Sequence, residues 1–275
     1  MIDFEETEFQ LRTEKVQKHM FENNVDAILL CTEPEVRYFT GFRSLFWQSP
    51  TRPWFVVIPK NGKPIAIIPD IGRDLMTRTW IDDIRTWPSP RREDEGISLL
   101  VEVLEGTKNI GILMGEEASL RMPLEDFEKL KLKIDGTFSD CSKIIKKVRL
   151  IKSEKEILIL KNICSVANRS FDRANRLFFS GQPLNEAFRE FKITLLEEGA
   201  EEVPYLVGGA GRDGYVDVIS PPSSKPLENG DILMLDTGST LKGYFCDFDR
   251  NWAIGSASDI AKRAYSKLHK VTELA

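Results

Sequence analysis

The spacing of apolar residues in the first half of the chain alternates between helical and extended patterns. Helical spacing covers residues 5–24, 93–105 and 123–132. Extended apolar runs cover Asp26–Cys31, Trp54–Pro59, Pro64–Pro69 and Asn109–Met114. Two of these runs flank Asn61-Gly62, a dipeptide typical of hairpin turns. Alternation of this kind predicts an α/β domain with a mixed sheet that ends near residue 145.

The second half begins with the longest helical pattern in the chain. We interpret the basic stretch Lys146–Lys152 as a connector. Ser153 and Glu156 then have the spacing of a capping box, in which each side chain accepts a hydrogen bond from the backbone of the other residue. Apolar residues follow at steps of three and four, at Ile157, Leu160, Cys164, Ala167, Phe171, Ala174 and Phe178. This stripe predicts one helix that lies along a sheet.

Strands dominate the remainder of the chain, after a second amphipathic helix at about 184–198. Residues 231–239 and 244–253 predict two strands. Ser258–Leu274 predicts a final amphipathic helix, with one face formed by Ile260, Ala264, Leu268 and Val271. With 275 residues the chain exceeds the usual size of one domain, so we expect two domains, 1–145 and 146–275.

Composition and charge exclude several classes of protein. The net charge of −5 argues against a nucleic-acid-binding protein, which normally has a basic patch. The longest apolar runs are too short to span a bilayer, and the acidic N-terminus lacks the features of a signal peptide. The four cysteines have no pairing pattern, which is typical of buried thiols in a reducing compartment. We therefore expect a cytoplasmic protein.

Two further segments have competing interpretations. Val207–Gly211 superficially resembles a phosphate-binding loop, but it lacks the dinucleotide-binding pattern and a clear strand–helix context. We interpret it as a loop that approaches substrate with its backbone. The aromatic residues Phe42, Phe46, Trp47, Trp54 and Phe55 form either a pocket or partner surface, or part of the core.

The most specific feature is a pair of aspartates on the two strands predicted at 231–239 and 244–253. If Leu241 and Lys242 form a two-residue turn, Asp236 and Asp247 face each other, with Cβ atoms about 4.5–5.5 Å apart. Asp249 lies on the same face, because side chains alternate along a strand. Carboxylates this close repel unless a cation or shared proton lies between them. The pair therefore indicates either a divalent-metal site suited to hydrolysis or a solvated acidic surface.

Three motifs in the same order resemble the pita-bread metallopeptidase family, which includes Xaa-Pro aminopeptidase, prolidase and creatinase. Arg37–Phe42 resembles the creatinase-type N-terminal domain, and Val148–Ile157 resembles the domain junction. Leu235-Asp236-Thr237-Gly238, followed by Asp247, resembles the first metal-ligand pair. The resemblance implies a creatinase-type α/β domain followed by part of an α+β pita-bread domain.

The resemblance also implies a function. Asp236 would be a bidentate ligand to one metal ion, and Asp247 would bridge two ions, which in this family are manganese, cobalt, iron or zinc. The expected activity is metal-dependent hydrolysis of Xaa-Pro peptides by a homodimer, with neither nucleic acid nor membrane as a partner. The expected substrate is a small peptide or another small molecule.

Three departures from the family pattern limit this expectation. The family completes its site with one histidine and two glutamates well downstream, whereas this sequence ends at Ala275, so we expect a truncated form. His269 lies too close to Asp247 to be that histidine, and we expect it to be structural or solvated. The substrate-binding histidine that peptidases carry before the first aspartate strand is absent from Val216–Pro222, where Asp217 or Ser220 could contact substrate. Asp249 replaces a frequent threonine and is an additional site candidate.

These departures leave two alternatives to a peptidase. One is a non-peptidase hydrolase or lyase of the creatinase-like type that acts on a small molecule. The other is a catalytically inactive binding protein that holds no metal ion, since two carboxylates are too few for tight binding. If the pair holds no metal, repulsion should raise the pKa of one aspartate.

Overall fold

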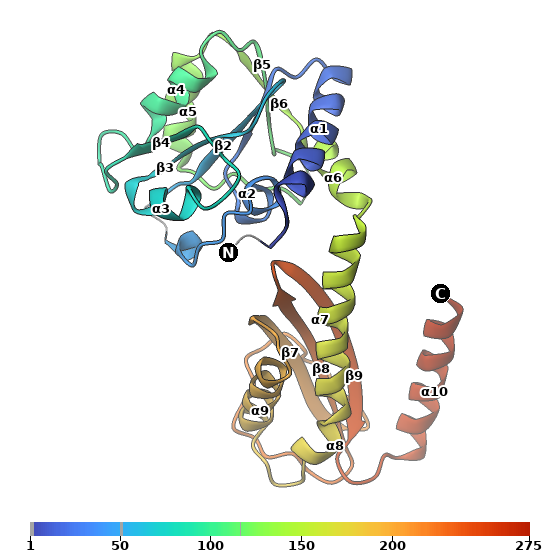
Figure 1. Ribbon diagram of the computed structural model, residues 1–275. Coiled ribbons are helices and arrows are strands. Elements are labelled where there is room, and N and C mark those ends of the chain that lie inside the picture. Colours follow the sequence, from blue (N-terminus) through green and yellow to red (C-terminus); the bar gives the residue numbers. More distant parts are fainter. Residues whose placement is uncertain (1–2, 50–51, 116) are drawn as a thin grey trace. The chain divides into compact units, whose positions relative to one another are not determined.

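The chain folds into two compact units, Met1–Lys152 and Ser153–Ala275. The computed structural model describes residues 3–49, 52–115 and 117–275 (Figure 1). The interpretation of Lys146–Lys152 as a connector is wrong, because most of it belongs to helix α6 (Ser142–Leu150). Ile145 and Val148 of this helix are buried, so its spacing is that of a packed helix whose basic residues face outward.

The N-terminal unit contains the predicted mixed sheet. Its six strands are β1 (Ala27–Leu30), β2 (Phe55–Pro59), β3 (Ile65–Pro69), β4 (Ile84–Trp87), β5 (Asn109–Ile112) and β6 (Thr137–Asp140). Their order is β4-β3-β2-β1-β5-β6. The β1–β2 and β2–β3 pairs are antiparallel, and the other three pairs are parallel. Antiparallel β2 and β3 confirm the hairpin around Asn61-Gly62, where Gly62 has a φ of +88°.

Helices cover both faces of this sheet. They are α1 (Glu6–Glu22), α2 (Glu33–Thr40), η1 (Phe46–Gln48), η2 (Asp70–Gly72), α3 (Arg73–Met76), α4 (Ile97–Leu104), α5 (Leu124–Lys133) and α6. Side chains of β1 alternate between two cores: Ile28 and Leu30 pack with α1, α2 and α6, whereas Ala27 and Leu29 pack with α4 and α5. The predicted helices at 5–24, 93–105 and 123–132 are confirmed. Strands β4 and β6 were missed because both carry several polar residues.

The aromatic cluster is mainly core. Phe42, Trp47, Trp54 and Phe55 are buried, and the Phe42 and Trp54 ring centroids lie 5.2 Å apart. Phe46 alone is 44% exposed. The interpretation as a pocket or partner surface is therefore not supported for the four buried rings.

Residues of two of the three motifs that indicated the family contact each other in the N-terminal unit, where the Arg149 guanidinium lies 5.9 Å from the centroid of the Tyr38 ring. The Arg149 guanidinium donates a hydrogen bond from Nη1 to Glu35 Oε1 at 2.6 Å, which links α6 to the start of α2. Helix α2 ends at Gly41, whose φ of 77° is accessible to glycine at little cost. The close resemblance of both segments to family motifs is therefore matched by a shared packing role.

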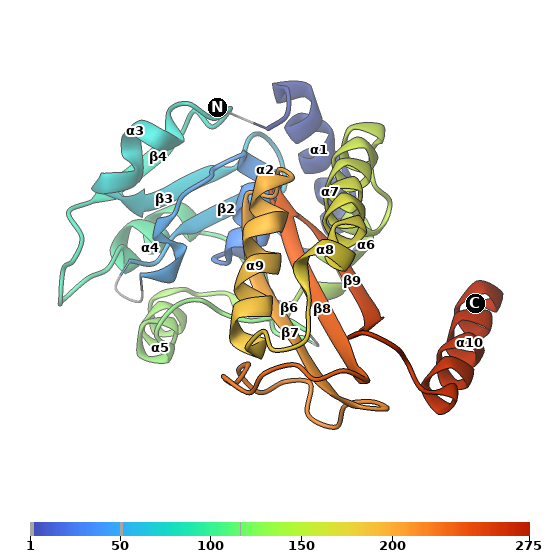
Figure 2. The ribbon, with the colours of Figure 1, turned by 90° about the horizontal axis from the view of Figure 1, so that it is seen from below.

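The C-terminal unit is a three-stranded antiparallel sheet with helices on one face. Its elements are α7 (Glu154–Asp172), α8 (Ala174–Leu177), α9 (Leu184–Glu197), β7 (Glu202–Arg212), β8 (Asp231–Leu241), β9 (Tyr244–Ala253) and α10 (Asp259–Leu274). The strand order is β7-β8-β9. Helix α7 packs on β8 and β9, and α9 packs on β7 (Figure 2). Between them lies a core that includes Leu233, Leu235 and Phe191.

The capping box at the start of α7 is confirmed. Ser153 N donates to Glu156 Oε2 at 2.8 Å, and Glu156 N donates to Ser153 Oγ at 3.2 Å. The Tyr244 hydroxyl donates to Glu156 Oε1 at 2.8 Å. The capping glutamate therefore also fixes the start of α7 to the first residue of β9.

The predicted stripe on α7 has the wrong phase in its first half. Ile159 and Ile163 are buried, whereas Ile157 is 41% exposed. The run Ile157–Leu160 is entirely apolar, so it satisfies more than one helical phase, and packing against the sheet selects among them. The stripe also ends earlier than predicted, because α7 stops at Asp172 and α8 is a separate turn.

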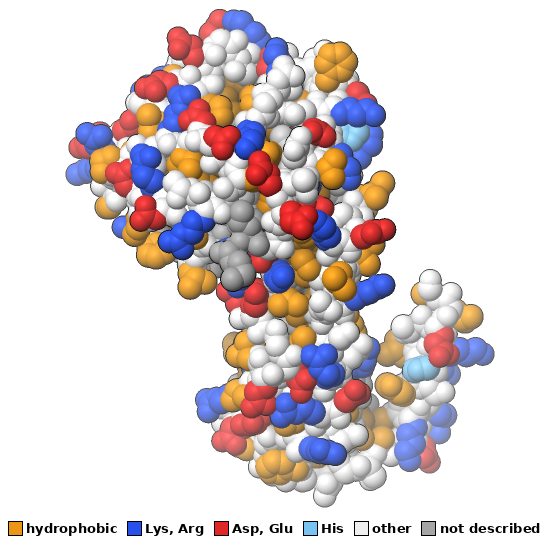
Figure 3. Space-filling model, viewed as in Figure 1, with side chains coloured by type: hydrophobic (Ala, Val, Ile, Leu, Met, Phe, Trp, Pro, Cys, Tyr) orange, Lys and Arg blue, Asp and Glu red, His pale blue; other side chains and the backbone are white. Residues whose placement is uncertain are grey.

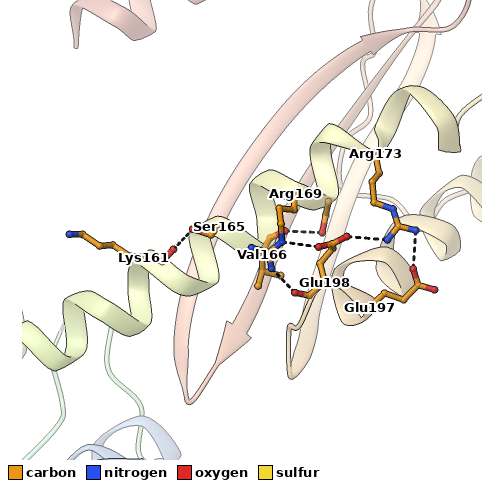
Figure 4. A network of polar contacts seen from close by, with 8 residues as sticks. Lys161, Ser165, Val166, Arg169, Arg173, Glu197 and Glu198 are labelled. Atoms are coloured by element: carbon orange, nitrogen blue, oxygen red, sulfur yellow. Dashed lines mark hydrogen bonds and ion pairs between the residues drawn. The ribbon is translucent and has the colours of Figure 1, made fainter.

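The C-terminal ends of α7 and α9 are joined by ion pairs (Figure 4). Arg169 Nε donates to Glu198 Oε2 at 2.8 Å, and Arg173 contacts both Glu197 and Glu198. Exposed pairs of this kind contribute little to stability, because solvent and salt screen them. Their main consequence is to fix the relative position of two helices that support the sheet.

Helix α10 is confirmed but packs weakly. Of its residues only Ala261 is buried, and Ile260, Leu268 and Val271 of the predicted apolar face are exposed. No helix in the described ranges combines the length and apolarity needed to cross a bilayer. On the face of the N-terminal unit seen in Figure 3, basic and acidic side chains are interspersed, with no extended basic patch in that view.

Candidate metal site on the β8–β9 hairpin

The hairpin that carries the aspartates turns one residue later than predicted. Leu241 pairs with Tyr244, so the turn residues are Lys242 and Gly243, with φ values of 53° and 76°. Positive φ at both positions is typical of a type I′ turn, which matches the twist of the two strands. The predicted Leu241–Lys242 turn is therefore wrong, because glycine at the second position determines where the chain reverses.

The corrected register changes which aspartates face each other. Asp236 lies directly opposite Asp249, whereas Asp247 lies opposite Gly238. Asp236 and Asp247 are thus diagonal neighbours, within reach of longer side chains. All three aspartates still occupy one face of the sheet, because the shift moves the pairing by two residues. The prediction of a shared face holds, and the prediction of a directly opposed pair is wrong.

A tyrosine from the third strand joins the two predicted ligands. Tyr205 of β7 lies opposite Gly238, which in turn lies opposite Asp247. The Tyr205 hydroxyl donates towards Asp247 Oδ1 at 2.7 Å and lies 3.1 Å from Asp236 Oδ1. One phenol oxygen therefore contacts both carboxylates, which shows that they converge from two strands.

Gly238 makes this contact possible. A Cβ atom added there would lie 1.9 Å from the Phe245 ring and 2.4 Å from the Tyr205 ring. These two rings stack over the glycine, with centroids 5.9 Å apart and an interplanar angle of 27°. Because no side chain intervenes, the phenol of Tyr205 crosses the middle strand and reaches Asp247 on the far strand.

The electrostatics of the pair match the sequence prediction in direction. The pKa of Asp236 is raised from its ordinary value, first by partial burial and then by the negative charges of Asp247 and Asp249. The hydrogen bond from Tyr205 acts in the opposite direction. Burial and the two acceptor carboxylates also raise the pKa of Tyr205, so its hydroxyl stays a donor. A raised pKa on one aspartate is confirmed, although burial rather than repulsion is its first cause.

The opposite face of the hairpin anchors these side chains. Leu233, Leu235 and Cys246 are buried beneath α7 and α9. Cys246 Sγ lies 3.1 Å from Ser239 Oγ, on the face away from Asp247, as strand alternation predicts. The four cysteines are free, and burial raises the pKa of the Cys31 thiol to about 11. None of these thiols belongs to a group of three or more possible metal ligands among the described residues.

The donor set is suited to divalent ions but does not complete a site. Carboxylate oxygens are the ligands preferred by hard ions such as Mn²⁺. Among residues 3–49, 52–115 and 117–275, no three His, Cys, Asp or Glu side chains lie close enough together to hold a metal ion. His269 instead lies on α10, 3.7 Å from Glu273, and its side chain is 57% exposed. Asp236 and Asp247 thus fit a metal site as two of its ligands.

Comparison with known proteins places this geometry in a family. Residues 12–151 match the creatinase/prolidase N-terminal domain, and residues 159–275 match metallopeptidase family M24. The chain belongs to the creatinase/prolidase-type proteins of metallopeptidase family M24. The predicted resemblance and fold class are thereby confirmed.

Relatives of this M24 chain are longer. An Xaa-Pro dipeptidase from Pyrococcus horikoshii is 25% identical over 257 residues, which cover 92% of this chain and 67% of the relative. The prolidase structure from Thermococcus sibiricus superposes with a TM-score of 0.82 at 20% identity, covering 97% of this chain and 71% of that one. A Pyrococcus horikoshii prolidase structure gives a TM-score of 0.76 at 24% identity, covering 93% and 68%. The chain spans about two thirds of the length of these proteins.

The glycine-rich segment of this M24 chain is a strand rather than a loop. Gly208, Gly209 and Gly211 lie in β7, so the interpretation as a substrate-approaching loop is wrong. A Cβ atom at Gly208 would lie 2.1 Å from the Met234 carbonyl oxygen, and one at Gly209 would lie 2.4 Å from the Asp217 carbonyl oxygen. The glycines are therefore required by close contact with β8 and with the segment that follows β7.

The segment that follows β7 contains no histidine, and the carboxylate of its Asp217 accepts hydrogen bonds from the backbone of nearby residues. Asp217 Oδ1 accepts hydrogen bonds from Ile219 N at 3.2 Å and Ser220 N at 3.1 Å. The Ser220 side chain, followed by these backbone bonds, lowers the pKa of Asp217. Asp217 thus shapes a turn, which leaves it less free to contact substrate than the sequence suggested.

The aspartate-bearing face continues into a pocket. Asn251 and Ala253 follow Asp249 on the same face of β9, and they line a cavity of about 540 Å³ together with Tyr215 and residues of α10. Burial raises the pKa of Tyr215, and Asn251 acts on it in the opposite direction. The cavity is large enough for a small ligand and begins two residues beyond Asp249 on β9, although none of the three aspartates is among its described lining residues.

Proposed function

We propose that this chain supplies two metal-binding carboxylates of a divalent-metal-dependent hydrolase that acts on Xaa-Pro peptides. The observation that carries the proposal is the convergence of Asp236 and Asp247 on the hydroxyl of Tyr205. The Xaa-Pro dipeptidase from Pyrococcus horikoshii, which matches over 92% of this chain, supports the substrate class. The pocket beside Asn251 supports a small substrate.

In this proposal Asp236 and Asp247 would hold the metal ions, drawn from manganese, cobalt, iron and zinc. When bound, such ions supply Lewis-acid activation of water near neutral pH. Tyr205 would orient both carboxylates through its hydroxyl, while the core beneath Leu233 and Leu235 keeps the strands in place. Further ligands are needed, because protein metal sites use three or more.

We also propose that the protein is cytoplasmic and forms a homodimer. The free, partly or fully buried cysteines support a reducing compartment. The homodimer rests on resemblance to two-domain members of the family. Size-exclusion chromatography with light scattering tests the dimer, and a monomer at micromolar concentration would contradict it.

The function is tested by Mn²⁺ titration calorimetry and by release of proline from Ala-Pro. In a protein that carries the further ligands together with this chain, we expect Mn²⁺ binding and Mn²⁺-dependent proline release, with both reduced about a hundredfold or more in Asp236→Ala and Asp247→Ala. Glu190→Gln, which removes an exposed carboxylate from α9, is the matched control and should match the wild type. A wild-type chain that neither binds Mn²⁺ nor releases proline would instead support the inactive binding protein.

A second candidate function is cleavage of a small non-peptide molecule, either by hydrolysis or by a lyase reaction. It is favoured by the absence of histidine from the segment before β8 and by the use of Asp217 in a local turn. Creatine and related betaines, assayed beside Ala-Pro under the same metal loading, separate the two activities. Turnover of a betaine without release of proline would favour this second candidate.

A further inference from the structure

Asp249 differs from the other two carboxylates of the site in its surroundings. Asp236 and Asp247 both contact the Tyr205 hydroxyl. Asp249 lies directly opposite Asp236. Over the described ranges, no hydrogen-bond donor or cationic group contacts the Asp249 carboxylate. Like charges directly opposite each other on a sheet are destabilising. The chain therefore maintains an uncompensated negative charge beside the predicted ligands.

The neighbouring cation does not neutralise this charge. Arg250 follows Asp249 on β9, but its side chain points to the opposite face of the sheet. There its guanidinium lies 5.2 Å from the centroid of the Phe248 ring and 5.7 Å from that of Phe171. Its Nη1 donates to the backbone carbonyl of Asp249 at 2.6 Å and leaves the carboxylate free.

Asp249 does not complete a ligand set either. The described His, Cys, Asp and Glu residues include no group of three arranged around a metal position. Its negative charge does act on Asp236, because it is one of the charges that raise the pKa of that carboxyl. An exposed charge beside a binding site acts through space and is screened by salt.

We propose that Asp249 is an electrostatic determinant of the metal site, which increases the affinity of the Asp236–Asp247 pair for a divalent cation without ligating it. The inference rests on the proposed function. A divalent cation would relieve the repulsion between Asp249 and Asp236. The charge of Asp249 therefore weakens the metal-free hairpin and strengthens the metal-loaded one.

The test measures Mn²⁺ affinity by calorimetry at about 0.01 M and about 1 M salt, where the screening lengths are about 30 Å and 3 Å. Asp249→Asn and Asp249→Thr remove the charge, and threonine also suits a strand. We expect both to weaken Mn²⁺ binding about three- to tenfold at low salt, with the difference nearly absent at high salt. Two control variants should bind Mn²⁺ with nearly the wild-type affinity. Asp249→Glu keeps a negative charge at position 249, and Glu190→Gln removes a negative charge from α9 instead.

Thermal unfolding gives a readout that does not depend on activity. Without metal at low salt, Asp249→Asn should unfold at a higher temperature than the wild type, and it should gain less from added Mn²⁺. If the wild type binds Mn²⁺ and the uncharged variants bind it equally well, the inference is overturned and the proposed function stands. If the wild type shows neither Mn²⁺ binding nor a Mn²⁺-induced rise in unfolding temperature, both fail together.

Discussion

The two sheets of this protein are covered differently, and the difference separates packed surfaces from the surface on which we propose the metal site. The six-stranded sheet of the N-terminal unit is packed with helices on both faces. In the sheet formed by β7, β8 and β9, the helices α7 and α9 pack on one face, and the other face carries the three aspartates. Both faces of the first sheet are therefore packed, whereas the second sheet has one packed face and one face that carries the aspartates of the proposed site.

The largest effect should come from the packed face of the second sheet. Phe191 is fully buried, and its ring lies 4.9 Å from that of Phe171 and 6.3 Å from that of Trp252. Phe191→Ala should lower the free energy of unfolding by about 3–5 kcal/mol, through lost burial and the cavity that remains. Denaturant unfolding of both proteins measures this, and a loss under about 1 kcal/mol would show that the core reorganises around the gap.

An intermediate effect should follow from Gly238→Ala on the face that carries the aspartates. The added methyl group would collide with the Phe245 and Tyr205 rings, so both must move. We expect a loss of about 1–3 kcal/mol in the free energy of unfolding, as for overpacking, together with weaker Mn²⁺ binding. Ser239, the next residue of β8, points to the opposite face, so Ser239→Ala is the matched control for Mn²⁺ binding.

If Gly238→Ala binds Mn²⁺ as the wild type does, the contact of Tyr205 with both carboxylates is not needed for the site. Tyr205→Phe separates the two explanations, since it keeps the ring and removes only the hydroxyl. Unchanged Mn²⁺ binding in both variants would show that the two aspartates bind the ion without help from the Tyr205 hydroxyl.

The smallest effect should be the pH dependence contributed by Asp236. Its pKa in the folded protein is raised above the ordinary value of 3.8, so the folded state holds this proton more tightly than the unfolded state. The contribution of this group to stability is therefore favourable at low pH and is lost as pH rises through 3.8 and the raised pKa. Asp236→Asn should be slightly more stable than the wild type above this window and no more stable below it.

Unfolding midpoints measured across the acid range, without metal, check this sign. A variant that is less stable than the wild type near neutral pH would contradict the prediction. Asp217→Asn should behave in the opposite way, because local hydrogen bonds lower the pKa of that carboxyl.

Much of the fold was predictable because local patterns and packing agree. The capping box of Ser153 and Glu156 marks the start of α7, and Asn61-Gly62 marks the β2–β3 hairpin. The spacing of apolar residues does not predict the buried side of a helix where more than one helical phase fits the sequence. The apolar run Ile157–Leu160 satisfies two helical phases, and only contact with the sheet decides which side is buried.

The site was only partly predictable for a similar reason. Alternation places Asp236, Asp247 and Asp249 on one face in either register, so that prediction survived an error in the turn. Tyr205 was missed because it is far from the aspartates in sequence, and a bulge interrupts the pairing of β7 before it. Gly238 is part of the motif that resembles the family, but the neighbouring residues in the sequence do not indicate that the Tyr205 ring from another strand lies over it.

The contact across Gly238 links two positions that are 33 residues apart and lie on different strands. A larger residue at 238 can be accommodated only if the ring at 205 is lost, and a small residue at 205 removes the need for glycine at 238. The two positions should therefore change together among related proteins. Laboratory selection from a library randomised at both positions should recover glycine at 238 mainly together with an aromatic residue at 205.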